Sequence, residues 1–328
     1  MLDSILESIH VVALPTKTNF RSVDTREVLL IEGPQGWGEF SPFIEYGPQE
    51  CAPWLVSAIE AAYVPPPKQL REWIPINATL PAINGADAVA EVLSWFPGCT
   101  SVKVKVGSNK AEDLARIALV RKLIPDAKIR LDVNGNWSVE QAVEILSDVL
   151  AQGSIEYVEQ PCSTQEQLRE LKEKLSHAVA IAGDEIIRKS PDPTALHLKG
   201  VIDIVALKVA PLGGIKRSLE IAKHYEMPVV VSSALDSAVG ISHGLRLASA
   251  VSDLPYACGL GTGALLAIDL YALPIVDGAI EVSAMSPNAQ IMSERAVSSE
   301  RLDWWRERVR QTWSAGAKQW ITKEGWIS

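Results

Sequence analysis

The chain has few of the residues that mark disulfide-stabilised, zinc-binding or membrane proteins. Its four cysteines, Cys51, Cys99, Cys162 and Cys258, stand far apart and form no CxxC pair. This pattern is typical of a reduced, cytoplasmic protein. No run approaches 18 apolar residues, and the first ten residues lack a basic region followed by an apolar one. We therefore expect neither a membrane span nor a signal peptide.

Histidine is scarce and basic residues do not dominate. None of the five histidines lies at a predicted strand end with ligand spacing, which disfavours zinc. The net charge of −9 argues against nucleic acid as a partner, although a local group of cations can still attract an anionic small molecule. No GxGxxG follows the first predicted strand of the main domain, and no GxSxG surrounds Ser232. These absences argue against a dinucleotide-binding sheet and against a serine nucleophile.

From residue 74 the chain alternates between short apolar runs and helical patterns. The predicted strands are 74–79, 101–106, 128–133, 155–160, 178–184, 203–209, 228–233 and 256–261. The pairs Ser138 with Gln141 and Ser163 with Glu166 each fit a capping box at the start of a helix. Eight strands with seven intervening helices predict an α/β fold, a (β/α)7β TIM-type barrel.

The two ends of the chain differ from the middle. Residues 1–71 predict an α+β capping domain with strands at 28–32 and 36–40, a helix near 50–62 and a break at the three prolines 65–67. Residues 72–268 would form the barrel, and residues 269–328 would pack on the barrel or the cap. Five of the ten tryptophans lie in the last 25 residues, which is more typical of packing than of a functional aromatic box.

Charged residues recur at an almost constant interval in the barrel segment. Lys105, Asp132, Glu159, Asp184 and Lys208 follow one another at steps of 27, 27, 25 and 24 residues. One strand, one helix and two short loops take about this much chain. Each residue ends an apolar run, so consecutive βα units would bring all five to the rim where barrel enzymes hold their active sites.

Strand alternation indicates which way these side chains point. Residues two apart share a face, so Lys103 and Lys105 would both point into the barrel while the intervening valines face the helices. The same parity turns Asp132, Glu159 and Lys208 inward. Solvated lysines on an edge strand are a poor alternative, because barrel strands have no solvent edge.

Three carboxylates without histidine or cysteine suit a hard cation, Mg²⁺ first and Mn²⁺ as an alternative. Such a cation leaves positions for a substrate carboxylate and would stabilise an enediolate formed by loss of the neighbouring proton. A lysine that takes this proton must be neutral, and positive neighbours and burial both lower a lysine pKa. The residues therefore predict proton abstraction next to a carboxylate.

The motifs VKVKVG, LDVNGNW, YVEQP, GDE and LKVAPLGG, in this order, resemble the enolase superfamily in its muconate-lactonizing-enzyme-like group. Together with GWGEFSPF, NATLPA, SSALDSAVG and GLGTG they cover nearly the whole chain and resemble the o-succinylbenzoate synthase family more specifically. The resemblance implies a Mg²⁺-dependent syn dehydration of 2-succinyl-6-hydroxy-2,4-cyclohexadiene-1-carboxylate to 2-succinylbenzoate, a step of menaquinone biosynthesis.

The resemblance also implies a role for each site residue. Lys105 would be the base and then the acid, Lys103 would tune it, and Lys208 would stabilise the enediolate. The metal ligands would be Asp132, Glu159 and Asp184, supported by Asn134 and Glu185. Substrate contacts would come from Ser232, Ser233, Gly261 and Thr262.

The stretch Thr16 to Thr25 reads as a mobile loop that closes over the substrate. Phe20 and Arg21 are the contact candidates, and Arg21 or Arg26 would pair with the succinyl carboxylate unless these arginines are simply solvated. An N-succinyl or N-acylamino acid racemase needs the same residues and stays an alternative. So does a non-catalytic barrel, which we would expect to have lost part of the ring. The oligomeric state is open and a monomer is compatible with the sequence.

Overall fold

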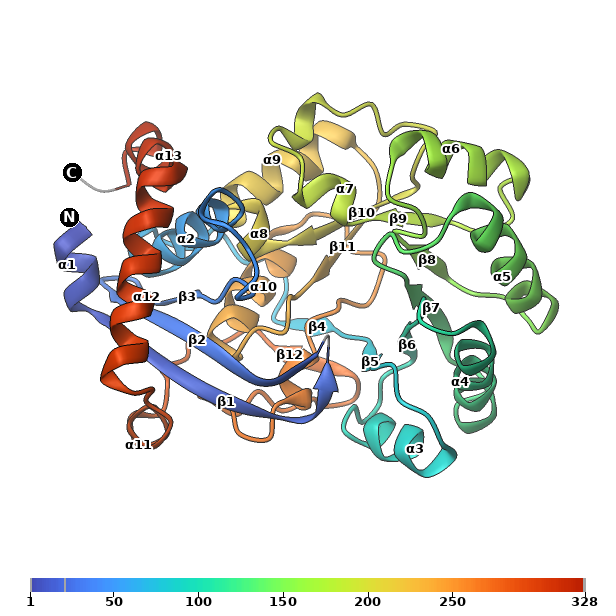
Figure 1. Cartoon of the computed structure of the whole chain (residues 1–328), viewed down its shortest axis with the longest axis horizontal. Coiled ribbons are helices and arrows are strands. Elements are labelled where there is room, and N and C mark those ends of the chain that lie inside the picture. Colours follow the sequence, from blue (N-terminus) through green and yellow to red (C-terminus); the bar gives the residue numbers. More distant parts are fainter. Residues whose placement is uncertain (1, 21, 327–328) are drawn as a thin grey trace.

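A computed structural model describes residues 2–20 and 22–326 of the chain. Figure 1 shows a cap beside a barrel, with both termini on the cap side. The cap contains α1 (Leu2–Glu7), an antiparallel sheet of β1 (Ile9–Phe20), β2 (Val23–Gly33) and β3 (Gly36–Phe40), and the helix α2 (Pro48–Tyr63). Within these described residues, no helix is long and apolar enough to span a bilayer.

The barrel contains seven parallel strands in the order β11-β10-β9-β8-β7-β6-β5. Their bounds are β5 (Ala78–Leu80), β6 (Ser101–Lys105), β7 (Lys128–Asp132), β8 (Tyr157–Glu159), β9 (Ile181–Gly183), β10 (Ile204–Lys208) and β11 (Val229–Ser232). The intervening helices are α3 (Ala86–Ser94), α4 (Lys110–Leu123), α5 (Val139–Ala151), α6 (Gln165–Lys174), α7 (Glu185–Arg188), α8 (Val209–Leu212), α9 (Ile215–Tyr225) and α10 (Ala238–Ala250). The alternation confirms the predicted (β/α)7β architecture.

The closing seam of the barrel differs from the prediction. Residues 256–261 form no strand, but make two isolated parallel bridges, Ser232 with Gly259 and Ile76 with Cys258, that join the first and last strands. The predicted strand 74–79 is also divided. Its first part is β4 (Trp73–Pro75), which pairs antiparallel with β12 (Ala279–Glu281) outside the ring. Pairing with a segment 200 residues away leaves no local pattern in the sequence.

Arg130 lies inside the barrel at this seam and is fully buried. Its Nε donates to Glu156 Oε2 at 2.5 Å, and its Nη1 donates to Asn77 Oδ1 at 3.0 Å and to the Ala257 carbonyl at 2.5 Å. The guanidinium also lies 4.9 Å from the ring centroid of Tyr157. One arginine thus joins β7 to both segments that lack a regular strand pairing.

Helix starts follow the capping chemistry expected from the sequence, with one shift. Ser138 and Gln141 form the predicted capping box of α5. At α6 the box is Thr164 with Gln167, one residue later than predicted. The Gln167 side chain accepts hydrogen bonds from the backbone of both Ser163 and Thr164, and this fixes the register.

The cap has its own core, shared with the end of the chain. β3 passes so close to α2 that a Cβ on Gly38 would lie 1.8 Å from the Ala58 carbonyl oxygen. α12 (Ser299–Thr312) brings Trp305 into the same core, and Trp313 follows in the π-helical turn Trp313–Ala317. α11 (Ala289–Glu294) and α13 (Lys318–Glu324) flank this pair. Trp320 and Trp326 pack against the same core, whereas Trp304 is exposed, so four of the five C-terminal tryptophans serve packing. Domain boundaries at residues 71 and 268 stay a prediction.

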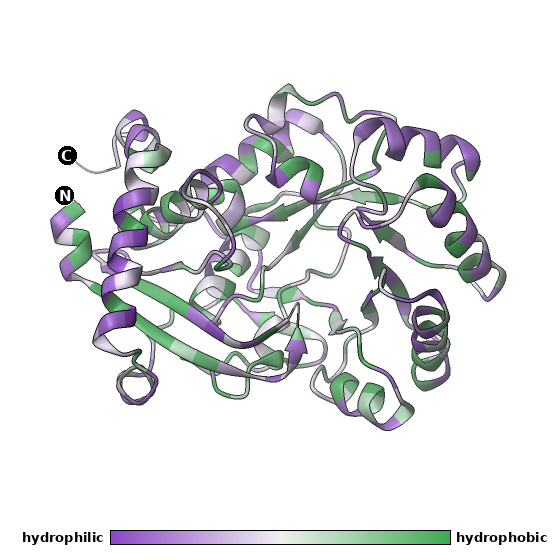
Figure 2. Ribbon diagram, viewed as in Figure 1, coloured by the Kyte–Doolittle hydropathy of each residue, from purple (hydrophilic) through white to green (hydrophobic). Residues whose placement is uncertain are grey.

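The predicted mobile loop 16–25 is instead the end of the β1–β2 hairpin, where the register shifts between Pro15 and Phe20. Figure 2 shows apolar colour along the body of the hairpin and hydrophilic colour toward its tip, so the polar composition suggested a loop. The tip contacts the barrel: Thr16 bridges Leu266, and Lys17 Nζ donates to the Ala264 carbonyl at 2.9 Å. The hairpin thus delivers Phe20 to the barrel mouth.

Candidate active site

Strand register places the predicted residues at one level of the barrel. Lys105 pairs with Asp132 and Asp132 pairs with Glu159 across β6, β7 and β8. Lys208 is at the same level as Ser232 on β11. The near-constant interval in the sequence therefore becomes a ring of side chains at the carboxyl ends of the strands.

Ammonium groups alternate with carboxylates around this ring. Lys103 Nζ lies 3.1 Å from Glu159 Oε2 and 3.8 Å from Asp132 Oδ2, and Lys105 Nζ lies 3.6 Å from Asp132 Oδ1. On the other wall, Lys208 Nζ contacts Asp184 Oδ2 and lies 3.8 Å from Glu159 Oε1. All five of the predicted ring residues, and Lys103, thus meet in one cluster.

The charge states follow from burial and these pairings. Burial lowers the pKa of Lys103, but the charges of Glu159, Asp132 and Asp184 outweigh it and raise that pKa above its ordinary value. Burial also lowers the pKa of Lys208, but the charges of Asp184 and Glu159 outweigh burial and raise that pKa. Both ammonium groups are therefore held in the charged form.

The carboxylates respond differently from one another. Burial raises the pKa of Glu159 and the nearby lysines do not fully offset it. Burial also acts to raise the pKa of Asp132 and of Asp184, but nearby cations outweigh it and lower both values: the lysines at Asp132, and Lys208, Arg188 and Lys103 at Asp184. The ring thus retains anionic oxygen donors.

The donor set fits a hard divalent cation, although its members do not converge. In the described ranges 2–20 and 22–326, no three carboxylate, histidine or cysteine groups are arranged as a metal site. The reason is local: the Lys103 ammonium lies between Asp132 and Glu159, and the Lys208 ammonium lies between Glu159 and Asp184. Asp132 Oδ1 and Asp184 Oδ1 are buried and accept no hydrogen bond from any described group. Such oxygens are suited to a cation.

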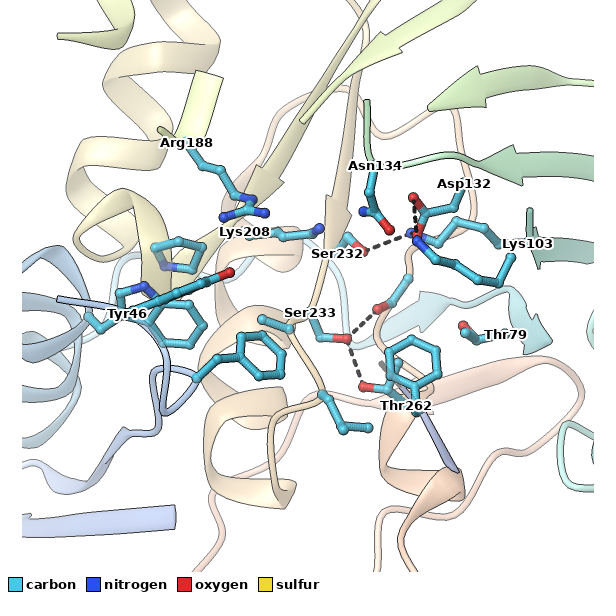
Figure 3. Close-up of a pocket in the computed structure, with 18 residues that line it drawn as sticks. Tyr46, Thr79, Lys103, Asp132, Asn134, Arg188, Lys208, Ser232, Ser233 and Thr262 are labelled. Carbon is cyan, nitrogen blue, oxygen red and sulfur yellow. Dashed lines mark hydrogen bonds and ion pairs between the residues drawn. The ribbon is translucent and has the colours of Figure 1, made fainter. Parts of the chain in front are cut away.

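A cleft lies over the ring. The cap supplies one wall with the aromatic residues Phe20, Phe43, Tyr46 and Trp54. Figure 3 shows the Tyr46 ring on the far side of the opening from Lys103 and Asp132. The predicted contact Phe20 lies here, whereas Arg21 lies outside the described residues.

Arg26 is not among the residues that line the cleft. Its side chain is buried, its Nε donates to the Leu235 carbonyl at 3.1 Å, and its Nη2 donates to the carbonyls of Ser41 and Ala234. Its ring contact is Phe43, with 4.5 Å between the guanidinium carbon and the ring centroid. Arg26 therefore joins cap to barrel, and the alternative in which it binds a substrate carboxylate loses its support.

Three of the four predicted polar contacts line the cleft. Ser232 Oγ lies 3.5 Å from Lys103 Nζ, and Ser233 Oγ lies 2.8 Å from Thr262 Oγ1. Gly261 is different, because a Cβ at this position would meet Ile76 and Phe96. The glycine of this turn that lines the cleft is Gly259, where a Cβ would lie 2.4 Å from Ser232 Oγ.

The two predicted supporting residues contact each other. Asn134 adopts a left-handed backbone conformation (φ 54°) after β7, and its Nδ2 donates to Glu185 Oε1 at 3.0 Å. Glu185 also accepts a hydrogen bond from Arg188 Nη2 at 2.8 Å. Arg188 lines the cleft, yet the sequence prediction missed it. Its position four residues after Asp184, one helical turn along α7, was the available signal.

Comparisons with known proteins agree with this geometry. Residues 87–287 match the enolase C-terminal domain-like family and residues 11–62 the enolase N-terminal domain-like family. The o-succinylbenzoate synthase of Mycolicibacterium smegmatis is 49% identical over 312 residues, which is 94% of this chain and 96% of that protein. The o-succinylbenzoate synthase of Mycobacterium tuberculosis is 47% identical over 318 residues, covering 95% and 96%.

Solved structures show the same fold. Muconate lactonizing enzyme from Pseudomonas fluorescens, complexed with muconolactone, aligns with a TM-score of 0.74 at 21% identity and covers 88% of this chain and 98% of its own. The N-succinyl Arg/Lys racemase from Bacillus cereus aligns with a TM-score of 0.74 at 20% identity, covering 88% and 97%. At these identities the likeness concerns the fold alone.

Proposed function

The chain belongs to the enolase superfamily and, within it, to the o-succinylbenzoate synthase family, and from this premise we propose the reaction of its cleft. The enzyme is a carbon–oxygen lyase that converts 2-succinyl-6-hydroxy-2,4-cyclohexadiene-1-carboxylate to 2-succinylbenzoate. The observation that carries this proposal is the ring of carboxylates between Lys105 on one wall and Lys208 on the other. Because the chain belongs to an enzyme family, the alternative that it is a non-catalytic barrel has no support.

Lys105 transfers the proton. Its neutral amine takes the hydrogen on the carbon next to the substrate carboxylate, and the electron pair of that C–H bond forms a double bond to the hydroxyl-bearing carbon. The C–O bond breaks, and the lysine returns the proton to the departing hydroxyl, which leaves as water. One residue on one face thus accounts for a syn dehydration, and the electron count closes without an oxidant.

Lys208 and Lys103 act by charge. The carboxylate neighbours raise the pKa of both lysines, so both carry a positive charge. Lys208 lies on the wall opposite Lys105 and would stabilise negative charge that develops on the substrate. Lys103 lies between Asp132 and Glu159, where it would fix their orientation and tune Lys105.

Members of this family depend on a divalent cation. We propose that this cation is Mg²⁺, with Mn²⁺ as a substitute. Its ligands would be the carboxylate oxygens of Asp132, Glu159 and Asp184. When bound, the cation would supply positive charge to the substrate carboxylate and make the adjacent proton more acidic. Lys103 and Lys208 would give up part of their carboxylate contacts to admit it. Asn134 and Glu185 would support the ligands from behind.

The remaining assignments concern the surroundings of the reaction. Ser232, Ser233 and Thr262 would bind polar groups of the substrate, while Gly261 would shape the turn. Four unpaired, buried cysteines suit a cytoplasmic enzyme. We propose a small carboxylate as the substrate and no role for nucleic acid, and a monomer is compatible with a cleft built within one chain.

The direct test is an ultraviolet assay of the purified protein with this substrate, because dehydration yields an aromatic ring. We expect turnover with Mg²⁺, loss of turnover with EDTA and recovery on adding Mg²⁺ back. No turnover, or turnover that EDTA does not change, contradicts the proposal.

A racemase of N-succinylamino acids is the second candidate. It is favoured by one observation: Lys105 and Lys208 line the same cleft from opposite walls, as two-base proton exchange requires. In D₂O, a racemase would exchange the α-proton of N-succinylamino acids, which proton NMR detects. Exchange that is faster than dehydration would reverse the order of the two candidates.

A further inference from the structure

Arg188 is the one arginine among the described residues that lines the cleft. Its side chain is only 6% exposed and is held on one edge by two carboxylates. Nε lies 3.3 Å from Asp184 Oδ1, and Nη2 donates to Glu185 Oε1 at 2.8 Å. Within the described part of the chain, no protein atom accepts a hydrogen bond from Nη1. The guanidinium is thus fixed in orientation and still has donors for a ligand.

The position of Arg188 is as informative as its pairing. Figure 3 shows Arg188 and Tyr46 at the end of the cleft away from Lys103 and Asp132, with Lys208 between the two ends. The Tyr46 ring packs edge-on against Phe43, with 5.6 Å between the ring centroids. Lys103 at one end, and Arg188 with the Tyr46 hydroxyl at the other, give the cleft hydrogen-bond donors at both ends.

We propose that Arg188, assisted by the Tyr46 hydroxyl, binds the second carboxylate of the substrate, at the end of its succinyl chain, and so determines specificity. This inference rests on the proposed function, which places the first carboxylate at the metal end. A planar guanidinium suits a carboxylate because two of its N–H groups can donate in parallel. Arg26, the sequence-based candidate, donates to backbone carbonyls instead.

Calorimetric binding of two ligands in saturating Mg²⁺ tests the assignment. The first is the product 2-succinylbenzoate, and the second is 2-butanoylbenzoate, which has a tail of similar length without the carboxylate. We expect the wild-type protein to prefer the first by roughly 10-fold to 100-fold, the range for a hydrogen bond to a charged group. In Arg188→Met this preference should fall to about one, while the affinity for 2-butanoylbenzoate changes by less than about 3-fold.

A purely structural role gives a different result. If Arg188 only positions Asp184 and Glu185, Arg188→Met weakens both ligands by the same factor and the preference survives, which overturns the inference. The matched control is Arg217→Met, an arginine on α9 that pairs with Asp192 at 3.1 Å outside the cleft. It should leave both affinities and their ratio unchanged.

Tyr46→Phe provides a second measurement that does not disturb the carboxylate pairs, and it decides the matter if Arg188→Met fails to fold. We expect the preference to fall several-fold with the 2-butanoylbenzoate affinity intact. An unchanged preference would contradict the assignment of this end of the cleft to the second carboxylate. If the wild-type protein neither dehydrates the substrate nor binds 2-succinylbenzoate, the proposed function fails and the inference with it. If it does both and the Arg188→Met preference equals wild type, only the inference fails.

Discussion

Removal of the Arg130 guanidinium should destabilise the barrel at its closing seam, where strand pairing is least regular. Regular pairing joins β5 through β11, but the seam from β11 back to Ile76 has only two isolated bridges. Arg130 spans this seam through Asn77 and the Ala257 carbonyl, and it neutralises Glu156. Arg130→Met keeps most of the side-chain volume and removes all three polar contacts.

The magnitude follows from what the substitution leaves behind. Breaking a buried ion pair by removing one partner costs roughly 3–5 kcal/mol. The Glu156 side chain is 14% exposed and also lies 3.7 Å from Lys128 Nζ, so part of its charge stays compensated. Asn77 is fully buried and loses a donor. We therefore expect the free energy of unfolding to fall by about 4 kcal/mol.

Urea unfolding followed by circular dichroism measures this loss. The control is Arg121→Met, whose arginine donates to the carbonyls of Gly153 and Val149 at 2.9 and 3.4 Å. No carboxylate is among these partners, so we expect a loss of about 1 kcal/mol. If Arg130→Met costs no more than Arg121→Met, the guanidinium does not hold the seam and the reasoning is refuted.

Two further predictions concern the cap. Burial and the charge of Asp236 raise the pKa of Glu39 to about 7 from 4.5, so its contribution to stability is present below pH 4.5 and lost as the pH rises through 7. Between pH 4.5 and 8, the free energy of unfolding of the wild-type protein should fall by about 3 kcal/mol more than that of Glu39→Gln. If the two proteins lose stability in parallel over this pH range, the prediction is wrong. Gly38→Ala forces a Cβ onto the Ala58 carbonyl and should lower the free energy of unfolding by about 3 kcal/mol, as measured by thermal unfolding. The control is Gly47→Ala, whose added Cβ would meet nothing within 4 Å, and it should lower the free energy of unfolding by less than about 1 kcal/mol.

The ring of lysines and carboxylates could be predicted because it depends on two local properties of the chain. Side-chain alternation decides which face of a strand each residue occupies, and the length of a βα unit decides how often a strand end recurs. Lys105, Asp132 and Glu159 consequently fall in register across β6 to β8. Neither property depends on how distant segments dock.

The parts that could not be predicted depend on distant contacts. Tyr46 and Phe43 reach the cleft only because the cap docks on the barrel. Arg26 does not line the cleft, because its donors bind backbone carbonyls such as that of Leu235 in the barrel. The β4–β12 pair joins residues 73–75 to residues 279–281, and no local pattern encodes that pairing. The tip of the β1–β2 hairpin is polar, so its composition indicated a loop although its backbone is largely paired.

The central claim is that Lys105 alone transfers the proton while Lys208 contributes charge. Ultraviolet turnover of Lys105→Ala, Lys208→Arg and the control Lys110→Ala, a half-buried lysine outside the cleft, tests it in one assay. We expect Lys105→Ala to lose on the order of 10²–10⁴-fold or more in kcat, Lys208→Arg to retain substantial dehydration because arginine keeps the charge, and Lys110→Ala to match wild type. Dehydration that survives in Lys105→Ala, or that vanishes equally in Lys208→Arg, would contradict the one-base account.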